Sequence, residues 1–261
     1  MMGAFFNVPA NQPAHRVVYN RMIRILYIAV SIITLAASCK KAEPPGYIAP
    51  VPINPVNPID TTRLKTYLAL GDSYTIGQSV SIQERFPNQA VELLALENIR
   101  FSAPEIIAQT GWTTASLINR LNTTPPLKST YDIVTLLIGV NNQYQRLPQE
   151  QYSTEFTLLL NRALVLANNK KSRVIVLSIP DYSVTPFGNN NNQVAKEIDA
   201  FNAINKQVAL AAGITYIDIT GSTRQALSDP SLVAADGLHP SGKEYRKWAL
   251  LLYPKIKTTL Q

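Results

Sequence analysis

The sequence has little cysteine and little histidine. Its 261 residues include one cysteine, Cys39, and two histidines, His15 and His239. A single cysteine excludes an intrachain disulfide, and so few thiols and imidazoles exclude the Cys/His clusters that hold structural zinc. We therefore expect a protein that uses no metal and no other cofactor.

Charged residues are also scarce, at 16% of the chain against 46% hydrophobic residues, a balance typical of a globular protein with one sizeable core. The net charge is +7, but Arg16, Arg21 and Arg24 all precede the first acidic residue. Beyond the pairs 40–41 and 170–171 there is no dense basic tract. Nothing therefore indicates a nucleic-acid partner.

The stretch around Cys39 has the layout of a signal peptide: a basic residue, an apolar segment over 25–37, then small residues. The apolar segment is shorter than the ~20 residues of a membrane-spanning helix. "LAASC" resembles a bacterial lipobox, with cleavage before Cys39 and a lipid on its sulfur; a short membrane anchor is the alternative. We expect residues 1–38 to be this signal peptide plus an extension, 1–21, with Met22 as the true start.

Residues 39–63 join this segment to the rest of the chain. Their six prolines disfavour helix and central strand, so we expect a semi-rigid spacer behind the lipidated cysteine. Such a spacer would hold a folded domain away from a membrane surface. We expect a monomer of the cell envelope, anchored by its lipid on the periplasmic or outer surface.

Residues 64–261 alternate short apolar runs with stretches of helical period, which indicates a parallel sheet covered on both faces. Strands are expected at 66–71, 99–109, 131–139, 172–180 and 214–220, and helices at 84–98, 113–121, 148–169, 194–213 and 241–260. Gly213 suits a left-handed helix end, and Ser241 with Glu244 fits a capping box. This is the pattern of one doubly wound α/β domain, in which functional groups collect at the carboxyl ends of the strands.

His239 is the one histidine that falls in this domain, and Asp236 precedes it by three residues in "DGLHPS". From a tight turn, the carboxylate reaches Nδ1–H of the imidazole and leaves Nε2 free to act as a base. An isolated histidine is more often a packed turn residue. The polar, loop-like surroundings directly before a capped helix favour the functional interpretation here.

Ser73 is the candidate nucleophile, in "LALGDSYTIG" at the end of an apolar run. A serine attacks acyl groups only if a base removes its proton and donors hold the oxyanion. Candidate donors are the backbone N–H of Ser73, Gly111 in "TGWTT" and the side chain of Asn141 in "IGVNNQY". Alone, each also fits a helix cap, a turn glycine or a loop residue. Their shared position after strands favours a joint site.

Other polar and aromatic residues near these motifs fit structural roles. Asp72 is expected to bind backbone amides of its turn, and Asp181 to shape the loop after its strand; their spacing does not select a glycosidase pair. Trp112 and Tyr74 could line a pocket or pack. The Asn-rich loop 188–193 could border the cleft or be solvated filler, and filler is the preferred interpretation.

The four motifs, in this order, resemble those of the SGNH hydrolases, the GDSL-like lipase/esterase family. The resemblance implies a three-layer α/β/α sandwich with a five-stranded parallel sheet, flavodoxin-like in order. It implies Ser73, Asp236 and His239 as the catalytic residues, and Ser73, Gly111 and Asn141 as the oxyanion hole. The Gly-x-Ser-x-Gly elbow of another hydrolase fold is missing.

One position departs from the family pattern: the third block commonly ends Gly-x-Asn-Asp, and Asn142 stands in place of the Asp. The resemblance predicts a serine esterase acting on acylated glycans, lysophospholipids or short-chain esters. The alternative is a non-catalytic glycan-binding or envelope scaffold lipoprotein that keeps the fold. A pure binder has no need of both Ser73 and His239, which favours the enzyme.

Overall fold

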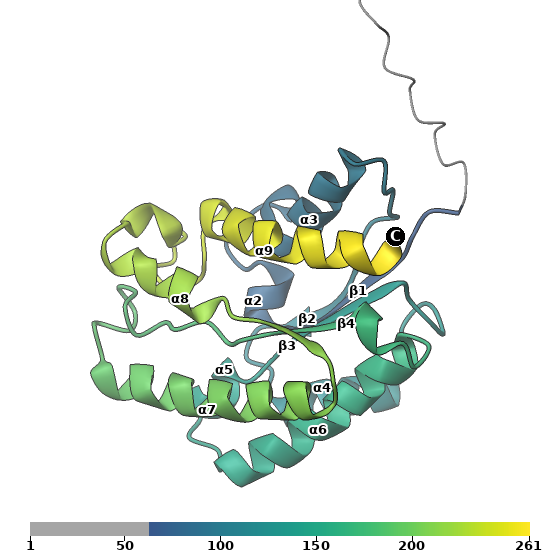
Figure 1. Ribbon diagram of the computed structural model, residues 1–261. Coiled ribbons are helices and arrows are strands. Elements are labelled where there is room, and N and C mark those ends of the chain that lie inside the picture. Colours follow the sequence, from purple (N-terminus) through teal and green to yellow (C-terminus); the bar gives the residue numbers. More distant parts are fainter. Residues whose placement is uncertain (1–62) are drawn as a thin grey trace, which may run out of the picture. The chain divides into compact units, whose positions relative to one another are not determined.

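Five parallel strands form the centre of the structure, a computed structural model that describes residues 63–261 (Figure 1). The strands are β1 Tyr67–Asp72, β2 Glu105–Gln109, β3 Ile133–Leu137, β4 Val174–Leu177 and β5 Thr215–Ile217. Their order in the sheet is β2-β1-β3-β4-β5, the flavodoxin-like arrangement. The expected signal peptide, the start at Met22, the lipidated Cys39 and the proline-rich spacer all lie outside the described residues.

Helices cover both faces of this sheet, which confirms the predicted three-layer α/β/α sandwich. The helices are α2 Ser73–Ile76, α3 Phe86–Ala95, α4 Thr114–Thr123, α5 Val140–Tyr144, α6 Gln149–Leu166, α7 Asn192–Ala211, α8 Thr220–Thr223 and α9 Gly242–Leu260. In Figure 1, α3 and α9 lie together on one face, and α4, α6 and α7 lie on the other. All described strand pairs are parallel, as the alternation of strands and helices predicts.

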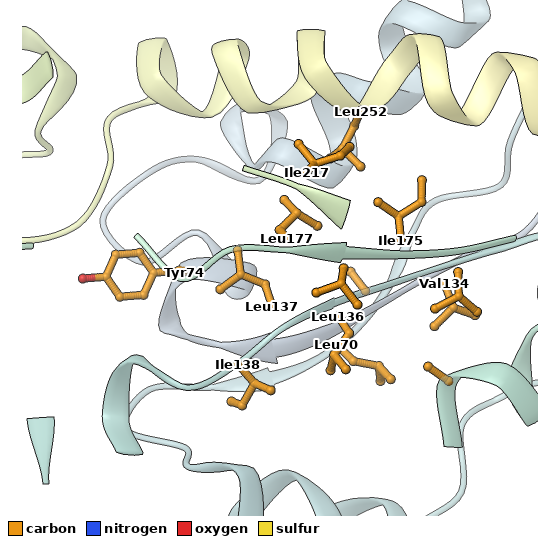
Figure 2. Packing of buried hydrophobic residues seen from close by; sticks show 14 of the residues in the cluster. Leu70, Tyr74, Val134, Leu136, Leu137, Ile138, Ile175, Leu177, Ile217 and Leu252 are labelled. Carbon is orange, nitrogen blue, oxygen red and sulfur yellow. The ribbon is translucent and has the colours of Figure 1, made fainter. Parts of the chain in front are cut away.

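The core explains why the central strands are continuous apolar runs. Every residue of β1, β3 and β4 is buried, because helices cover the sheet on both sides. Figure 2 shows Leu70, Leu136 and Leu177 in this core, with Leu252 of α9 above them. The rigid sheet thus fixes where each strand ends, and the candidate site is built on those ends.

Strands β2, β3, β4 and β5 are all shorter than the ranges expected from the sequence, and the ends of β2 and β5 show why. β2 begins only at Glu105, after Pro104, which has no N–H to donate to a sheet. β5 ends at Ile217, because the hydroxyl of Ser178 accepts the N–H groups of Ile219 and Thr220 at 2.8 and 3.1 Å and turns the chain into α8. The proline that delays β2 is visible in the sequence, whereas the contact with Ser178 that ends β5 is not.

The left-handed end predicted for α7 is confirmed, whereas the capping box predicted for α9 is wrong. Gly213 follows α7 with φ of 70°, the left-handed conformation expected there. At α9, Ser241 accepts the N–H of Glu244 at 3.4 Å, but the Glu244 carboxylate does not reach back, so the capping-box prediction is wrong. That buried carboxylate instead accepts the indole N–H of Trp248 at 2.8 Å, one turn further along the helix.

Candidate active site

The junction between β1 and α2 presents Ser73. Asp72 is the N-cap of α2 and accepts the N–H of Tyr74 at 3.0 Å, so the helix starts directly at Ser73. A Cβ on Gly71 would lie 2.0 Å from Oγ1 of Thr75 and 2.4 Å from the backbone oxygen of Leu137. Only glycine therefore allows β1 and α2 to meet this closely.

A cavity of about 230 Å³ lies at the carboxyl edge of the sheet. Four of the sequence-predicted residues line it: Ser73, Gly111, Asn141 and His239. They come from the ends of β1, β2 and β3 and from the turn before α9. The structure thus brings together groups that are as much as 166 positions apart in the sequence, as expected for the carboxyl edge of a parallel sheet.

Asp236 and His239 form the expected pair. Oδ2 of Asp236 lies 2.7 Å from Nδ1 of His239, and Oδ1 accepts the backbone N–H groups of His239 and Leu238 at 2.9 and 3.0 Å. Oδ2 also accepts the hydroxyl of Ser79 at 2.6 Å. Partial burial opposes ionisation of Asp236, but these hydrogen bonds prevail and hold its pKa well below the usual carboxyl range.

The buried imidazole of His239 is held on a second side by the ring of Tyr74, whose centroid lies 5.0 Å away. Tyr74 therefore both lines the cavity and packs, the two roles left open by the sequence. Within the described residues no hydrogen bond joins the side chains of Ser73 and His239, although both face the same cavity. Such contacts are often long before substrate binds.

The candidate oxyanion donors are arranged around the same space. Ser73 is the first residue of α2, where backbone N–H groups lack partners within the helix. Gly111 has φ of 81°, a left-handed conformation that favours glycine. Asn141, in the first turn of α5, donates one amide hydrogen to the backbone oxygen of Trp112 at 3.0 Å, which fixes the amide and leaves its second hydrogen for a ligand.

Asn142, the departure from the family pattern, ties two loops of the site together. Its Oδ1 accepts the N–H of Thr114 at 3.0 Å and its Nδ2 donates to Oγ1 of Thr114 at 2.6 Å. Thr114 in turn donates its hydroxyl to Glu155. Since the threonine hydroxyl has one hydrogen, it cannot also donate to a carboxylate at position 142, so an amide suits this network better.

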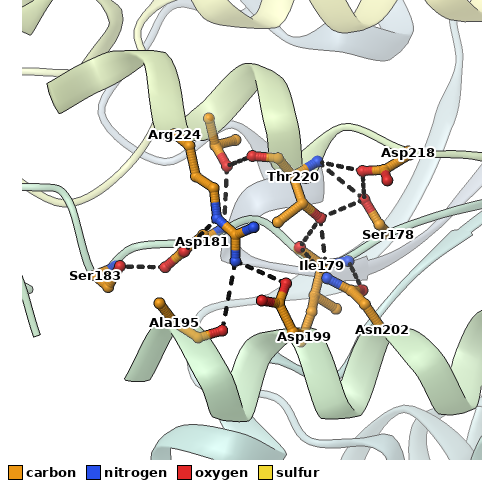
Figure 3. A network of polar contacts seen from close by, with 11 residues as sticks. Ser178, Ile179, Asp181, Ser183, Ala195, Asp199, Asn202, Asp218, Thr220 and Arg224 are labelled. Atoms are coloured by element: carbon orange, nitrogen blue, oxygen red, sulfur yellow. Dashed lines mark hydrogen bonds and ion pairs between the residues drawn. The ribbon is translucent and has the colours of Figure 1, made fainter. Parts of the chain in front are cut away.

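The two other carboxylates have structural roles. Asp181 is buried, accepts the N–H of Ser183 at 2.8 Å and pairs with Arg224 at 2.8 Å, as Figure 3 shows. It shapes its loop, as predicted. Asp72 binds a backbone amide of its turn, also as predicted, and burial raises its pKa to about 7. Nothing indicates a glycosidase pair, because Asp181 is held by Arg224 and neither carboxylate lines the cavity that contains Ser73.

An aromatic wall of the cavity was missed by sequence reasoning. Tyr144, Tyr182 and Phe187 pack against one another with ring centroids 6.1 to 6.3 Å apart. Tyr144 and Phe187 are about half exposed at the cavity mouth. Phe187 belongs to the loop that leads into the Asn-rich segment interpreted as filler; Tyr182 and Phe187 in the loop that follows β4 were the signal that could have placed this loop at the site.

The Asn-rich segment itself also has a definite role. Asn191 caps α7, accepting the N–H groups of Gln193 and Val194 at 3.0 and 3.4 Å, and Asn189 and Asn190 take left-handed conformations.

In residues 63–261 no three His, Cys, Asp or Glu side chains gather in a way that could hold a metal ion. Over the same residues, no helix has the length and apolar character needed to cross a bilayer.

Comparisons with known proteins bear on the family and the fold of the chain. A sequence model of the GDSL-like lipase/acylhydrolase family matches residues 69–247. No curated protein sequence matched the chain.

Several solved structures share the fold. A lipase/acylhydrolase from Enterococcus faecalis has 18% identity and a TM-score of 0.59 over 74% of this chain and 96% of that chain. An acetylxylan esterase from Geobacillus stearothermophilus has 18% identity and a TM-score of 0.58 over 74% and 94%. A lipase from a goat rumen metagenome has 21% identity and a TM-score of 0.61 over 73% and 97%.

Proposed function

Because the chain belongs to the GDSL-like lipase/acylhydrolase family and is a carboxylic ester hydrolase, we propose that it cleaves esters of short acyl groups through Ser73, His239 and Asp236. The observation that carries the proposal is the cavity that Ser73 and His239 both line, with Asp236 bound to the far nitrogen of the imidazole. A base oriented in this way has one free nitrogen, and it faces the space that holds the hydroxyl.

The reaction proceeds in two halves. Nε2 of His239 takes the proton of Ser73 as Oγ attacks the ester carbonyl, and the N–H groups of Ser73 and Gly111 and the Asn141 amide hold the oxyanion. The imidazolium, stabilised by Asp236, gives its proton to the leaving alcohol, and the acyl group stays on Oγ. Water, deprotonated by the same imidazole, then attacks the acyl-enzyme and releases the acid and free Ser73.

The size and lining of the cavity support a small acyl group. At about 230 Å³ it is smaller than the ~300–1,000 Å³ of typical ligand pockets, so a long chain would extend beyond it. Acetylated glycans are therefore the first candidate substrates, in line with the acetylxylan esterase among the structural neighbours. The apolar wall of Tyr144, Tyr182 and Phe187 favours lysophospholipids as the second candidate.

We also propose that the protein is a monomeric lipoprotein of the cell envelope. The sequence around Cys39 supports the anchor, and the proline-rich spacer that follows supports a catalytic domain held at a distance from the membrane.

A fluorophosphonate probe tests the proposed mechanism. We expect the wild type to be labelled, and Ser73→Ala and His239→Ala to lose labelling and ester hydrolysis. If the wild type is folded by circular dichroism but is not labelled, the result would favour the non-catalytic scaffold over the esterase. Rates on p-nitrophenyl esters of rising chain length, beside acetylated polysaccharides and lysophospholipids, then decide the substrate; a rate that rises with chain length would reject the short acyl group.

Asn141→Ala examines the oxyanion hole separately. Removal of one oxyanion donor costs about 10²–10³ in kcat. Because Asn141 also binds the backbone oxygen of Trp112, the melting temperature of the variant is measured alongside. An unchanged kcat would remove this amide from the mechanism.

A further inference from the structure

The carboxylate of Asp236 has one partner from a distant part of the chain. Its Oδ1 is satisfied by backbone N–H groups of its own turn, from Leu238 and His239. Its Oδ2, the oxygen that faces the imidazole, also accepts the hydroxyl of Ser79 at 2.6 Å, across 157 positions of sequence. Among the hydrogen bonds of the described residues, this is the only one to Asp236 that comes from outside the turn.

The backbone at Ser79 is unfavourable for a residue with a side chain. Its φ is 67°, in the left-handed region where a Cβ crowds the backbone and glycine is favoured. Gly77, two positions earlier, takes the same conformation at 65° and is a glycine. The described contact of the Ser79 hydroxyl is with Asp236, and this hydrogen bond helps to offset the strain.

The neighbouring residue links the same loop to another part of the site. Oε1 of Gln78 accepts the hydroxyl of Thr110 at 2.6 Å, beside Gly111. The segment 78–79 therefore touches both the loop of the candidate oxyanion glycine and the turn of the catalytic acid, five and six positions after Ser73. Gln78 and Thr110 line the cavity, whereas Ser79 does not, so Ser79 reaches the chemistry only through Asp236.

We propose that Ser79 is a positioning residue of the esterase site: its hydroxyl fixes Asp236 and shares the charge of the oxygen that faces His239. This proposal rests on the proposed function of Asp236 and His239. Two effects follow. The hydroxyl stops the carboxylate from swinging away from the imidazole, which keeps Nε2 aimed at Ser73. It also weakens the attraction between the carboxylate and the imidazolium, because part of the negative charge is directed to the hydroxyl.

Removal of the hydroxyl therefore has a signature that a merely structural residue lacks. The full charge of Oδ2 then faces the ring, which favours the imidazolium, so the acidic limb of the kcat/KM profile moves to higher pH. Other titratable groups that share a small cavity with His239 stay unchanged in every variant below: Tyr74, Asp181, Tyr182 and Glu244. A shift of the limb thus reports the contact between Ser79 and Asp236.

The experiment compares Ser79→Ala, Ser79→Gly and Ser81→Ala in the full-length protein, with p-nitrophenyl acetate as substrate. Ser79→Ala keeps the left-handed strain and loses the hydroxyl, while Ser79→Gly loses both. Ser79→Gly therefore shows whether a defect in Ser79→Ala comes from the lost hydroxyl or from poor folding at a strained position. Ser81→Ala removes a hydroxyl of the same loop that binds Glu84 rather than Asp236. It serves as the matched control.

We expect kcat to fall about tenfold in both Ser79 variants with KM within twofold, since Ser79 does not line the cavity. We expect the acidic limb to move up by about 0.5 pH unit in both, and Ser81→Ala to match the wild type. The proposal would be overturned if both Ser79 variants kept the kcat and the acidic limb of the wild type. It would also be overturned if Ser79→Ala showed a change that Ser79→Gly does not share. If His239→Ala is inactive in those same assays, the proposed function survives the failure; an unlabelled, inactive wild type would instead refute the proposed function itself.

Discussion

Asp72 places a buried carboxyl directly beside the candidate nucleophile. Its side chain is fully buried, one oxygen binds the N–H of Tyr74, and the other has no partner among the described residues. Burial raises its pKa to about 7, despite the opposing hydrogen bond from Tyr74. In an unfolded chain the pKa of this carboxyl is about 4. Between that pH and the folded-state pKa, the folded protein keeps a proton that the unfolded chain has released.

The contribution of Asp72 to the stability of the protein should therefore fall as the pH rises from 4 to 7. In that window the folded state binds more protons than the unfolded state, so the free energy of unfolding decreases with pH, by at most about 4 kcal/mol from this group. Asp72→Asn keeps the oxygen that caps α2 and removes the titration. Urea unfolding at pH 4 and pH 8 should show the variant gaining stability relative to the wild type at the higher pH.

Parallel stability curves for the wild type and Asp72→Asn would contradict this account. The comparison cancels other carboxyls, because both proteins carry them. The pKa of Asp236 in the folded state lies well below this window. Its contribution to stability is therefore lost mainly as the pH falls below the window.

At the scale of the elements, the contact between β1 and α2 depends on Gly71. The nearest atoms to an added Cβ are the Thr75 hydroxyl and the backbone oxygen of Leu137 in β3, and that strand cannot move without disturbing the core. Gly71→Ala should cost about 1–3 kcal/mol or more by overpacking, measured by urea unfolding. Gly221→Ala, in α8, adds a methyl that meets nothing within 4 Å and should leave stability nearly unchanged.

Equal stability of the two alanine variants would show that the junction can relax, and would remove the packing argument for glycine before Asp72. A loss confined to Gly71→Ala would show that this glycine is required by packing between elements. Any loss of activity in Gly71→Ala would then be an indirect effect of the displacement of Ser73.

The elements and the main site residues were readable from the sequence because each left a local signal. Buried strands such as β3 are continuous apolar runs, and Ser73, Gly111, Asn141 and His239 each follow a strand or precede a helix. The order of the strands in the sheet came from the family resemblance. Periodicity alone does not contain it.

What could not be predicted depends on contacts between distant segments. The hydrogen bond from Ser79 to Asp236 spans 157 positions and involves a serine whose left-handed conformation has no local marker. The Glu244 carboxylate matched a capping motif, but Trp248 offered a buried donor on the same helix. In both cases three-dimensional packing selects a partner that the local sequence does not indicate.

At the scale of the whole molecule, the proposed catalytic residues and the proposed anchor lie in separate parts of the chain. Every residue that lines the cavity lies between Ser73 and His239, and the family match spans 69–247, whereas the proposed anchor is Cys39. A change at Cys39 should therefore alter where the protein is found without altering its reaction.

Cys39→Ala tests this separation in a bacterial host fed with labelled palmitate. We expect the wild type to carry the label and sediment with membranes, and the variant to lose both while its kcat/KM on p-nitrophenyl acetate stays within twofold. Ser38→Ala is the matched control, because it keeps a small residue before the cysteine and should still be lipidated. Membrane association that persists in Cys39→Ala without the label would exclude this cysteine as the sole anchor and favour an uncleaved apolar segment, since residues 25–37 would then hold the protein at the membrane by themselves.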